Sequence, residues 1–244
     1  MKAPVLVSGI VLLALIGGGG GYLGGQRLDG RVTAPGYAGP LPGDAATSPT
    51  AAPTPSGTPS VPLIRKTPQP NPLEALNLDD LEFKTRNFTV TGDVAGQVKL
   101  SIRVPAGWTL NPTKDKPSEV KFIDSSGERA VRVESALYPD KSVKQAMQDV
   151  LTNVQSSQPY QNFVDPLFQA TGQVKDDDGT LRQVATLVYT YIPGATSRYV
   201  IVRFVATGGG DVATVSMSVT GLPKEQKVLE KILAEATASV RIRD

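Results

Sequence analysis

The sequence predicts an α+β domain in which an antiparallel β-sheet is flanked by two amphipathic helices. Three observations predict it: runs of alternating apolar and polar residues, short turns between neighbouring runs, and two stretches with apolar residues at helical spacing. Strand-like runs followed by a helix occur twice along the chain. Because each amphipathic helix has to bury one face against the sheet, we expect an α/β/α sandwich.

An uncharged segment opens the chain. Residues 3–25 carry no charge and as a helix would span about 34 Å, enough to cross the hydrocarbon core of a membrane. We therefore expect residues 1–25 to be a signal-anchor that forms a single transmembrane segment. The apolar run from Val5 to Ile16, followed by small residues, also fits a signal peptide that is cleaved from a secreted protein.

The next segment, residues 26–73, is rich in Pro, Thr and Ala and is predicted to be a disordered linker. Of the 20 prolines, 11 lie between Arg31 and Leu73. With few aliphatic side chains, such a segment does not bury enough apolar surface to offset its ordering entropy. The linker is expected to be a spacer, and residues 74–244 remain as the globular domain.

The first half of the domain predicts strands and then a helix. Residues 98–104 alternate Val, Leu, Ile and Val with polar residues, as in a half-buried strand that ends at Pro105. Runs at 120–123 and 131–133 flank a Ser-Ser-Gly turn and predict a hairpin, whose second strand has Arg132 and Glu134 on a solvent-exposed face. Asp140 or Ser142 is the predicted cap of the helix that follows. Its buried stripe comprises Val143, Ala146, Met147, Val150, Leu151 and Val154.

The second half repeats this order. Strand-like runs occupy about 167–174, 181–192, 198–206 and 212–220, and short turns rich in Asp, Pro and Gly join them as antiparallel neighbours. A closing helix begins near Pro223. Its apolar stripe comprises Leu229, Ile232, Leu233, Ala236 and Val240.

Composition excludes several classes of function. The chain has no Cys and no His, which rules out disulfides, thiolate nucleophiles, Ser-His dyads and His-liganded metals. From residue 74 onward, 20 Lys and Arg face 21 Asp and Glu, so the domain lacks the basic surface that nucleic-acid binding requires. We expect no enzyme activity, no cofactor, no metal and no nucleic-acid partner.

A resemblance to a known family rests on three pieces of the domain. Pro105-Ala106-Gly107-Trp108, the hairpin Val120–Gly127 and the strand Val131–Val133 together resemble the opening of PsbP/LpqN-like domains. The order of elements over residues 86–242 also agrees. The resemblance implies an α/β/α sandwich in an exported actinobacterial protein with a non-enzymatic binding or assembly role. Lipid or partner-protein binding is a further implication, but the resemblance implies no catalytic residues.

Four aromatic residues are candidate contacts for a ligand or partner. Trp108 either stacks on a ligand or closes the core at a strand end. Tyr189 and Tyr191 share one face of their strand, and Tyr199 lies in the next strand; they either pack beneath a helix or line an apolar pocket. The acidic turn Asp176–Gly179 is typical of a hairpin and lacks the spacing of a calcium loop.

These observations predict a membrane-tethered binding or assembly module whose domain lies outside the cytoplasm. The Pro-rich spacer and the missing cysteines favour that location, whereas the charges beside the apolar segment leave its orientation open. The expected partner is a protein or a component of the cell envelope. The alternative is an extracytoplasmic lipid carrier or chaperone with an apolar pocket between sheet and helix. The sequence does not set an oligomeric state.

Overall fold

A computed structural model describes residues 64–92, 96–135 and 140–243. The predicted signal-anchor at 1–25 and the linker as far as residue 63 lie outside the described residues. Within the described part, no helix is both long enough and apolar enough to cross a membrane. The structure is mixed α+β with antiparallel sheets and two main helices, which confirms the α+β class.

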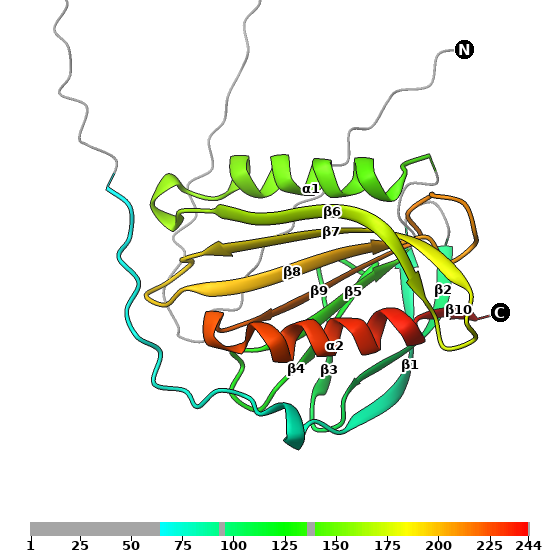
Figure 1. Cartoon of the computed structure of the whole chain (residues 1–244), viewed down its shortest axis with the longest axis horizontal. Helices are drawn as coiled ribbons and strands as arrows, with labels where there is room; N and C mark the ends of the chain where they lie inside the picture. Colours follow the sequence, from blue (N-terminus) through cyan, green and yellow to red (C-terminus); the bar gives the residue numbers. More distant parts are fainter. Residues whose placement is uncertain (1–63, 93–95, 136–139, 244) are drawn as a thin grey trace, which may run out of the picture. The chain divides into compact units, whose positions relative to one another are not determined.

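A seven-stranded antiparallel sheet forms the centre of the domain, in the order β3-β4-β5-β9-β8-β7-β6 (Figure 1). The hairpin of β4 and β5 and the run from β6 to β9 confirm the strands predicted in each half of the domain. The strands are β3 (Thr109–Pro112), β4 (Glu119–Ile123), β5 (Ala130–Ser135), β6 (Asp165–Lys175), β7 (Leu181–Tyr191), β8 (Arg198–Val205) and β9 (Val215–Gly221).

A second, three-stranded sheet was not predicted. Its order is β1-β2-β10, with β1 (Phe83–Gly92), β2 (Gly96–Pro105) and β10 (Arg241–Arg243), and both pairings are antiparallel. The half-buried strand predicted at 98–104 is β2. Alternation identifies such a strand, but it does not say which partners pair with it, and β10 comes from the far end of the chain.

Helix α1 (Val143–Ser157) covers one face of the large sheet. Ser142 caps it, and the Ser142 and Gln145 side chains form a reciprocal capping box with the backbone. The predicted stripe packs on alternate residues of β7 and β8, including Leu187, Val200 and Phe204. Of the two predicted caps, Asp140 and Ser142, the structure therefore has Ser142. Leu151, which was predicted to belong to the buried stripe, is only partly buried.

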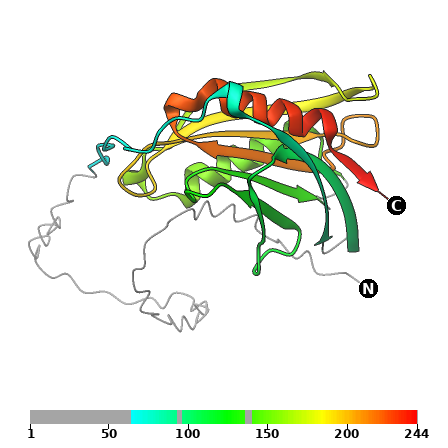
Figure 2. The same cartoon turned by 90° about the horizontal axis from the view of Figure 1, so that it is seen from below.

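Helix α2 (Gln226–Ser239) and the small sheet cover the opposite face, as Figures 1 and 2 both show. Pro223 begins the 3₁₀ turn η3 (Pro223–Glu225), and α2 follows directly; η1 (Leu78–Asp80) and η2 (Tyr160–Asn162) are two further short turns. The α2 stripe packs with Ile102 of β2, Phe122 of β4 and Met217 of β9 in one cluster. The large sheet therefore lies between two separate apolar cores.

One face predicted to be exposed is buried. Arg132 of β5 has 6% of its surface exposed, and the Glu134 side chain has 13%. Both belong to a cluster of charges in which Arg132 lies 3.6 Å from Glu119 and Lys116 lies 2.8 Å from Glu134. Charged side chains can be buried when they pair with opposite charges. The alternation of polar and apolar residues does not reveal such pairing, and it therefore predicted a solvent-exposed face.

Residues 64–82 form a strap along the domain, drawn in cyan in Figures 1 and 2. The Lys66 N–H donates to the Gln161 carbonyl at 2.9 Å, and the Gln69 N–H donates to the Ala195 carbonyl at 2.7 Å. The Lys66 ammonium also donates to Asn162 Oδ1 and to the carbonyls of Ile192 and Pro193. The domain therefore includes residues 64–73, which composition assigns to the linker, because specific hydrogen bonds hold them.

Candidate binding groove

A groove of about 500 Å³ lies between the large sheet and α2. Strands β7 and β8 form its floor, and β6 and α2 form its two walls. The volume falls in the range of sites that bind small molecules or short anchoring segments. The lining residues are Leu167, Phe168, Thr186, Val188, Tyr199, Ile201, Arg203, Gln226, Glu230 and Leu233.

Two apolar side chains on the β6 wall are accessible to solvent. Leu167 has 52% of its surface exposed and Phe168 has 55%. The register between β6 and β7 shifts between Pro166 and Phe168, so that Leu167 lies at a bulge. Large apolar residues at the mouth of a groove are typical of a surface that contacts a ligand or partner.

Arg203 brings a positive charge into this groove. Its Nε donates to Thr186 Oγ1 at 3.0 Å and its Nη1 donates to Thr237 Oγ1 at 3.2 Å. Burial lowers the pKa of the Arg203 guanidinium, and no carboxylate of the described residues lies within ion-pair distance of it. By contrast, Arg129, Arg132, Arg182 and Arg198 are buried and each pairs with a carboxylate.

Tyr199 lies in the floor of the groove with 4% of its surface exposed. Burial, and then the negative charge of Glu230 on α2, raise the pKa of its phenol. Glu230 itself accepts a hydrogen bond from the Gln226 side chain at 3.0 Å. The α2 wall is therefore polar and acidic, whereas the β6 wall is apolar.

The two other candidate tyrosines lie on the opposite face of the sheet. Tyr189 and Tyr191 belong to the core beneath α1, with ring centroids 5.8 Å apart and ring planes inclined at 52°. Burial raises the pKa of both phenols. Consecutive strands thus send Tyr199 to one side of the sheet and the pair to the other, and only Tyr199 lines the groove.

Trp108, the fourth candidate, has 5% of its surface exposed and belongs to the core cluster that includes α2. It also lines a shallow depression of about 350 Å³ together with Pro105 and Gly107. Its N–H on the backbone donates to the Pro105 carbonyl at 3.1 Å, which closes the turn after β2. Trp108 is therefore not part of the groove lining.

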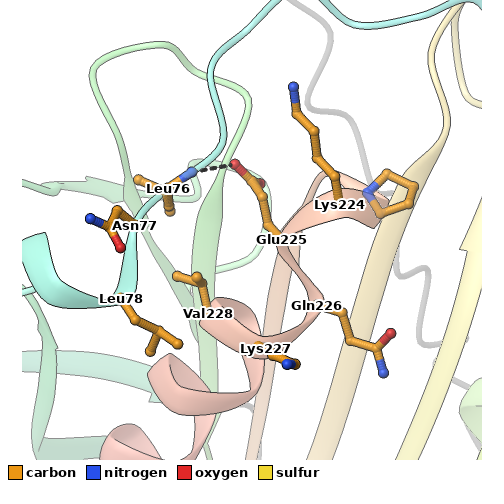
Figure 3. A pocket seen from close by; sticks show the side chains of 9 residues that line it. Leu76, Asn77, Leu78, Lys224, Glu225, Gln226, Lys227 and Val228 are labelled. Carbon is orange, nitrogen blue, oxygen red and sulfur yellow. Dashed lines mark hydrogen bonds between the residues drawn. The ribbon is translucent and has the colours of Figure 1, made fainter.

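A second pocket, of about 420 Å³, lies where the strap meets the start of α2 (Figure 3). Glu225 at its base is 1% exposed and accepts hydrogen bonds from the Leu76 N–H at 3.0 Å and the Leu222 N–H at 2.8 Å. Arg129 Nε donates to the same carboxylate at 2.8 Å. The Glu225 carboxylate thus accepts hydrogen bonds from the strap, from Leu222 and from Arg129. It joins the strap to the start of α2 and is not free to bind a ligand.

The acidic turn after β6 is also satisfied by its own chain. Asp176 accepts hydrogen bonds from the N–H groups of Asp178 and Thr180 and lies 2.7 Å from Arg182. Burial opposes ionisation, but these donors outweigh it and hold the pKa of Asp176 below its usual value. Within the residues that the structure describes, no group of acidic side chains is arranged to hold a metal ion.

Sequence reasoning missed Arg203, Leu167 and Phe168. One signal was available: Tyr199, Ile201 and Arg203 alternate on one face of β8, so that an arginine interrupts an apolar row. The exposure of Leu167 had no such signal, because the bulge that turns it outward depends on pairing with β7.

No protein-family model matches the chain, and no curated protein matches it by sequence. Among solved structures, it is similar to the 1.9 Å crystal structure of the Ran-binding protein Mog1p of Saccharomyces cerevisiae. That match has a TM-score of 0.41 and 15% sequence identity, and covers 66% of this chain and 97% of the other. A likeness at this level carries no argument about partner or function.

Proposed function

We propose that the chain is a non-enzymatic binding or assembly module, tethered to a membrane, that presents a PsbP/LpqN-like domain outside the cytoplasm. Its partner is a protein or a component of the cell envelope. The apolar segment at residues 3–25 and the Pro-rich stretch after it support the tether and the spacer. The groove beside α2 supports the binding role.

The exposure of Leu167 and Phe168 at the mouth of the groove carries this proposal. Their side chains leave apolar surface in water that neither core of the domain covers. A partner that covers them gains about 25 cal/mol for each Å² of apolar surface removed from water. Glu230 on one wall and Arg203 in the floor give that partner an orientation.

Site-specific photo-cross-linking tests the site. A photoreactive amino acid replaces Leu167 in the full chain in its native membrane, and the matched control replaces Leu181, which is 55% exposed but lies outside the groove lining. We expect a defined adduct from position 167 to a molecule other than a second copy of this chain, none from position 181, and loss of that adduct when Phe168→Glu is added. Equal labelling from both positions would contradict the proposal.

A lipid carrier or chaperone is the second candidate, because the groove lies between sheet and helix and has Val188, Ile201 and Leu233 in its lining. Native mass spectrometry of the purified full chain distinguishes the two functions. A carrier is expected to retain a co-purified lipid that Leu167→Asp displaces and Leu181→Asp leaves in place. Protein that is consistently empty rejects the carrier and leaves the protein-binding module.

A further inference from the structure

The two edges of the seven-stranded sheet differ in length and composition. At one edge β3 has four residues and ends in Pro112, which lacks an N–H for further pairing. At the other, β6 has 11 residues, and in the part of the chain that the structure describes no strand pairs with its outer side. The outer side of β6 therefore offers a long row of backbone donors and acceptors.

The centre of β6 lacks the features by which proteins usually protect an edge strand. Such features are charged side chains, prolines and bulges. In β6 the charges, Asp165 and Lys175, lie at the two ends, and Pro166 and the bulge lie near the beginning. Residues 168–174 form a regular, uncharged segment, and most of them are exposed.

This segment is complementary to itself in antiparallel pairing. Phe168, Ala170, Gly172 and Val174 point to the α2 face of the sheet, since they pair with β7 residues on that face. If two copies of 168–174 pair about Thr171, Phe168 lies opposite the partner's Val174, and Ala170 lies opposite the partner's Gly172. Large apolar residues thus meet across the strands at both ends, and small residues meet in the middle.

We infer that the outer edge of β6 pairs with the same edge of a second copy of this chain, in antiparallel register about Thr171. The two large sheets then form one continuous sheet, with a two-fold axis through Thr171. Pairing satisfies the outward backbone groups of both strands and covers part of each exposed Phe168. Lys175 lies opposite the partner's Leu167, so no like charges meet within residues 167–175.

Cysteine cross-linking tests the register directly, because the chain has no cysteine of its own. Directly opposite residues of antiparallel strands have Cα atoms about 4.5 to 5.5 Å apart, within the range that a disulfide spans. We expect Thr171→Cys in the purified full chain to form a covalent dimer under mild oxidation. Gln148→Cys, on the exposed side of α1, reports random collision. The inference is overturned if the two variants cross-link equally.

A charge exchange at the same position gives an independent test that requires no oxidation. Thr171→Lys and Thr171→Asp each place two like charges on the two-fold axis, and each is expected to weaken dimerisation about fivefold in analytical ultracentrifugation. An equimolar mixture of the two variants is expected to restore it, because Lys then faces Asp. Gln148→Lys is the control. Monomeric wild-type chain, or a mixture no tighter than either variant, overturns the inference whatever the groove binds.

Discussion

Two arginines beside α2 occupy contrasting environments. Arg129, near the start of the helix, donates to Glu225 and Asp124 and to the carbonyl of Glu74 in the strap. Arg203, beneath the later turns, donates to two threonine hydroxyls and faces an open groove. Burial would lower the pKa of Arg129, yet the two carboxylates raise it, whereas burial lowers the pKa of Arg203 with nothing to oppose it.

The difference separates a structural ion cluster from a surface that still has binding capacity. The carboxylates around Arg129 already balance its charge, so a ligand would gain little by binding there. Removing one of these carboxylates leaves a buried charge without its partner. The hydroxyls around Arg203 satisfy its donors only in part and do not balance its charge. We therefore expect changes at the first place to alter stability and changes at the second to alter binding.

The largest expected effect is that of Glu225→Ala. It leaves Arg129 buried without its main partner and frees the Leu76 and Leu222 N–H groups, so we expect a loss of about 3 to 5 kcal/mol in the free energy of unfolding. Urea denaturation measures it. Glu230→Ala, at an exposed position of α2, is expected to change stability by less than about 0.5 kcal/mol. Similar losses of stability from both variants would show that the ion pair between Arg129 and Glu225 does not stabilise the fold.

Gly221→Ala probes the packing around the same carboxylate. A Cβ at Gly221 would lie 2.8 Å from Glu225 Oε2 and 2.9 Å from Leu229 Cδ2, closer than real Cβ atoms approach. We expect a loss of about 1 to 3 kcal/mol from overpacking, measured by urea denaturation. At Gly208 an added Cβ meets nothing within 4 Å, so Gly208→Ala is the control. If Gly221→Ala were as stable as the control, the site would be less rigid than the structure indicates.

Asp176 extends the comparison to a third arginine, Arg182, through pH. Because its pKa in the folded state is below the ordinary value of 3.8, the unfolded chain binds the proton more tightly. The stability that this carboxylate contributes is present above pH 3.8 and is lost as the pH falls through the lower, folded value. We expect Asp176→Asn to flatten the stability profile in that acidic range. An unchanged profile in thermal unfolding across that range would contradict the lowered pKa.

Arg203→Met is expected to have the smallest effect on folding. It removes a partly buried charge that no carboxylate of the described residues balances, so the free energy of unfolding should change by less than about 1 kcal/mol. The matched Arg182→Met removes the guanidinium that pairs with Asp176 and donates to the Val240 carbonyl, and is expected to destabilise the domain more than Arg203→Met does. Thermal and urea unfolding compare them. A large loss from Arg203→Met would assign Arg203 a structural role like that of Arg129.

Periodicity was sufficient for much of the fold. The alternation in residues 98–104, the hairpin at 120–133 and the stripe that begins at Val143 depend on residues close in sequence, and the structure confirms them. The apolar stripes of α1 and α2 also predicted which side of each helix is buried.

The remaining features depend on contacts between distant residues. Pairing of β10 with β2 joins Ile242 to Leu100, and no local pattern indicates it. The buried position of Arg132 depends on Glu119, and the strap depends on a lysine that reaches the carbonyls of Ile192 and Pro193. An apolar pocket between sheet and helix, with Tyr199 in its lining, was one of two alternatives that the sequence left open. Its two walls were not predicted, because they come from β6 and α2, which are distant in sequence.

The strap also determines how the domain resists mechanical load. A force that pulls on the chain ahead of Ile64 reaches Lys66 and Gln69 before it reaches β1. The hydrogen bonds of those two residues to Gln161 and Ala195 are separate from the ladder between β1 and β2. They can therefore break one after another while both sheets stay paired, so that residues 64–70 extend under tension before the contacts of Glu74 and Leu76 with Arg129 and Glu225 carry the load.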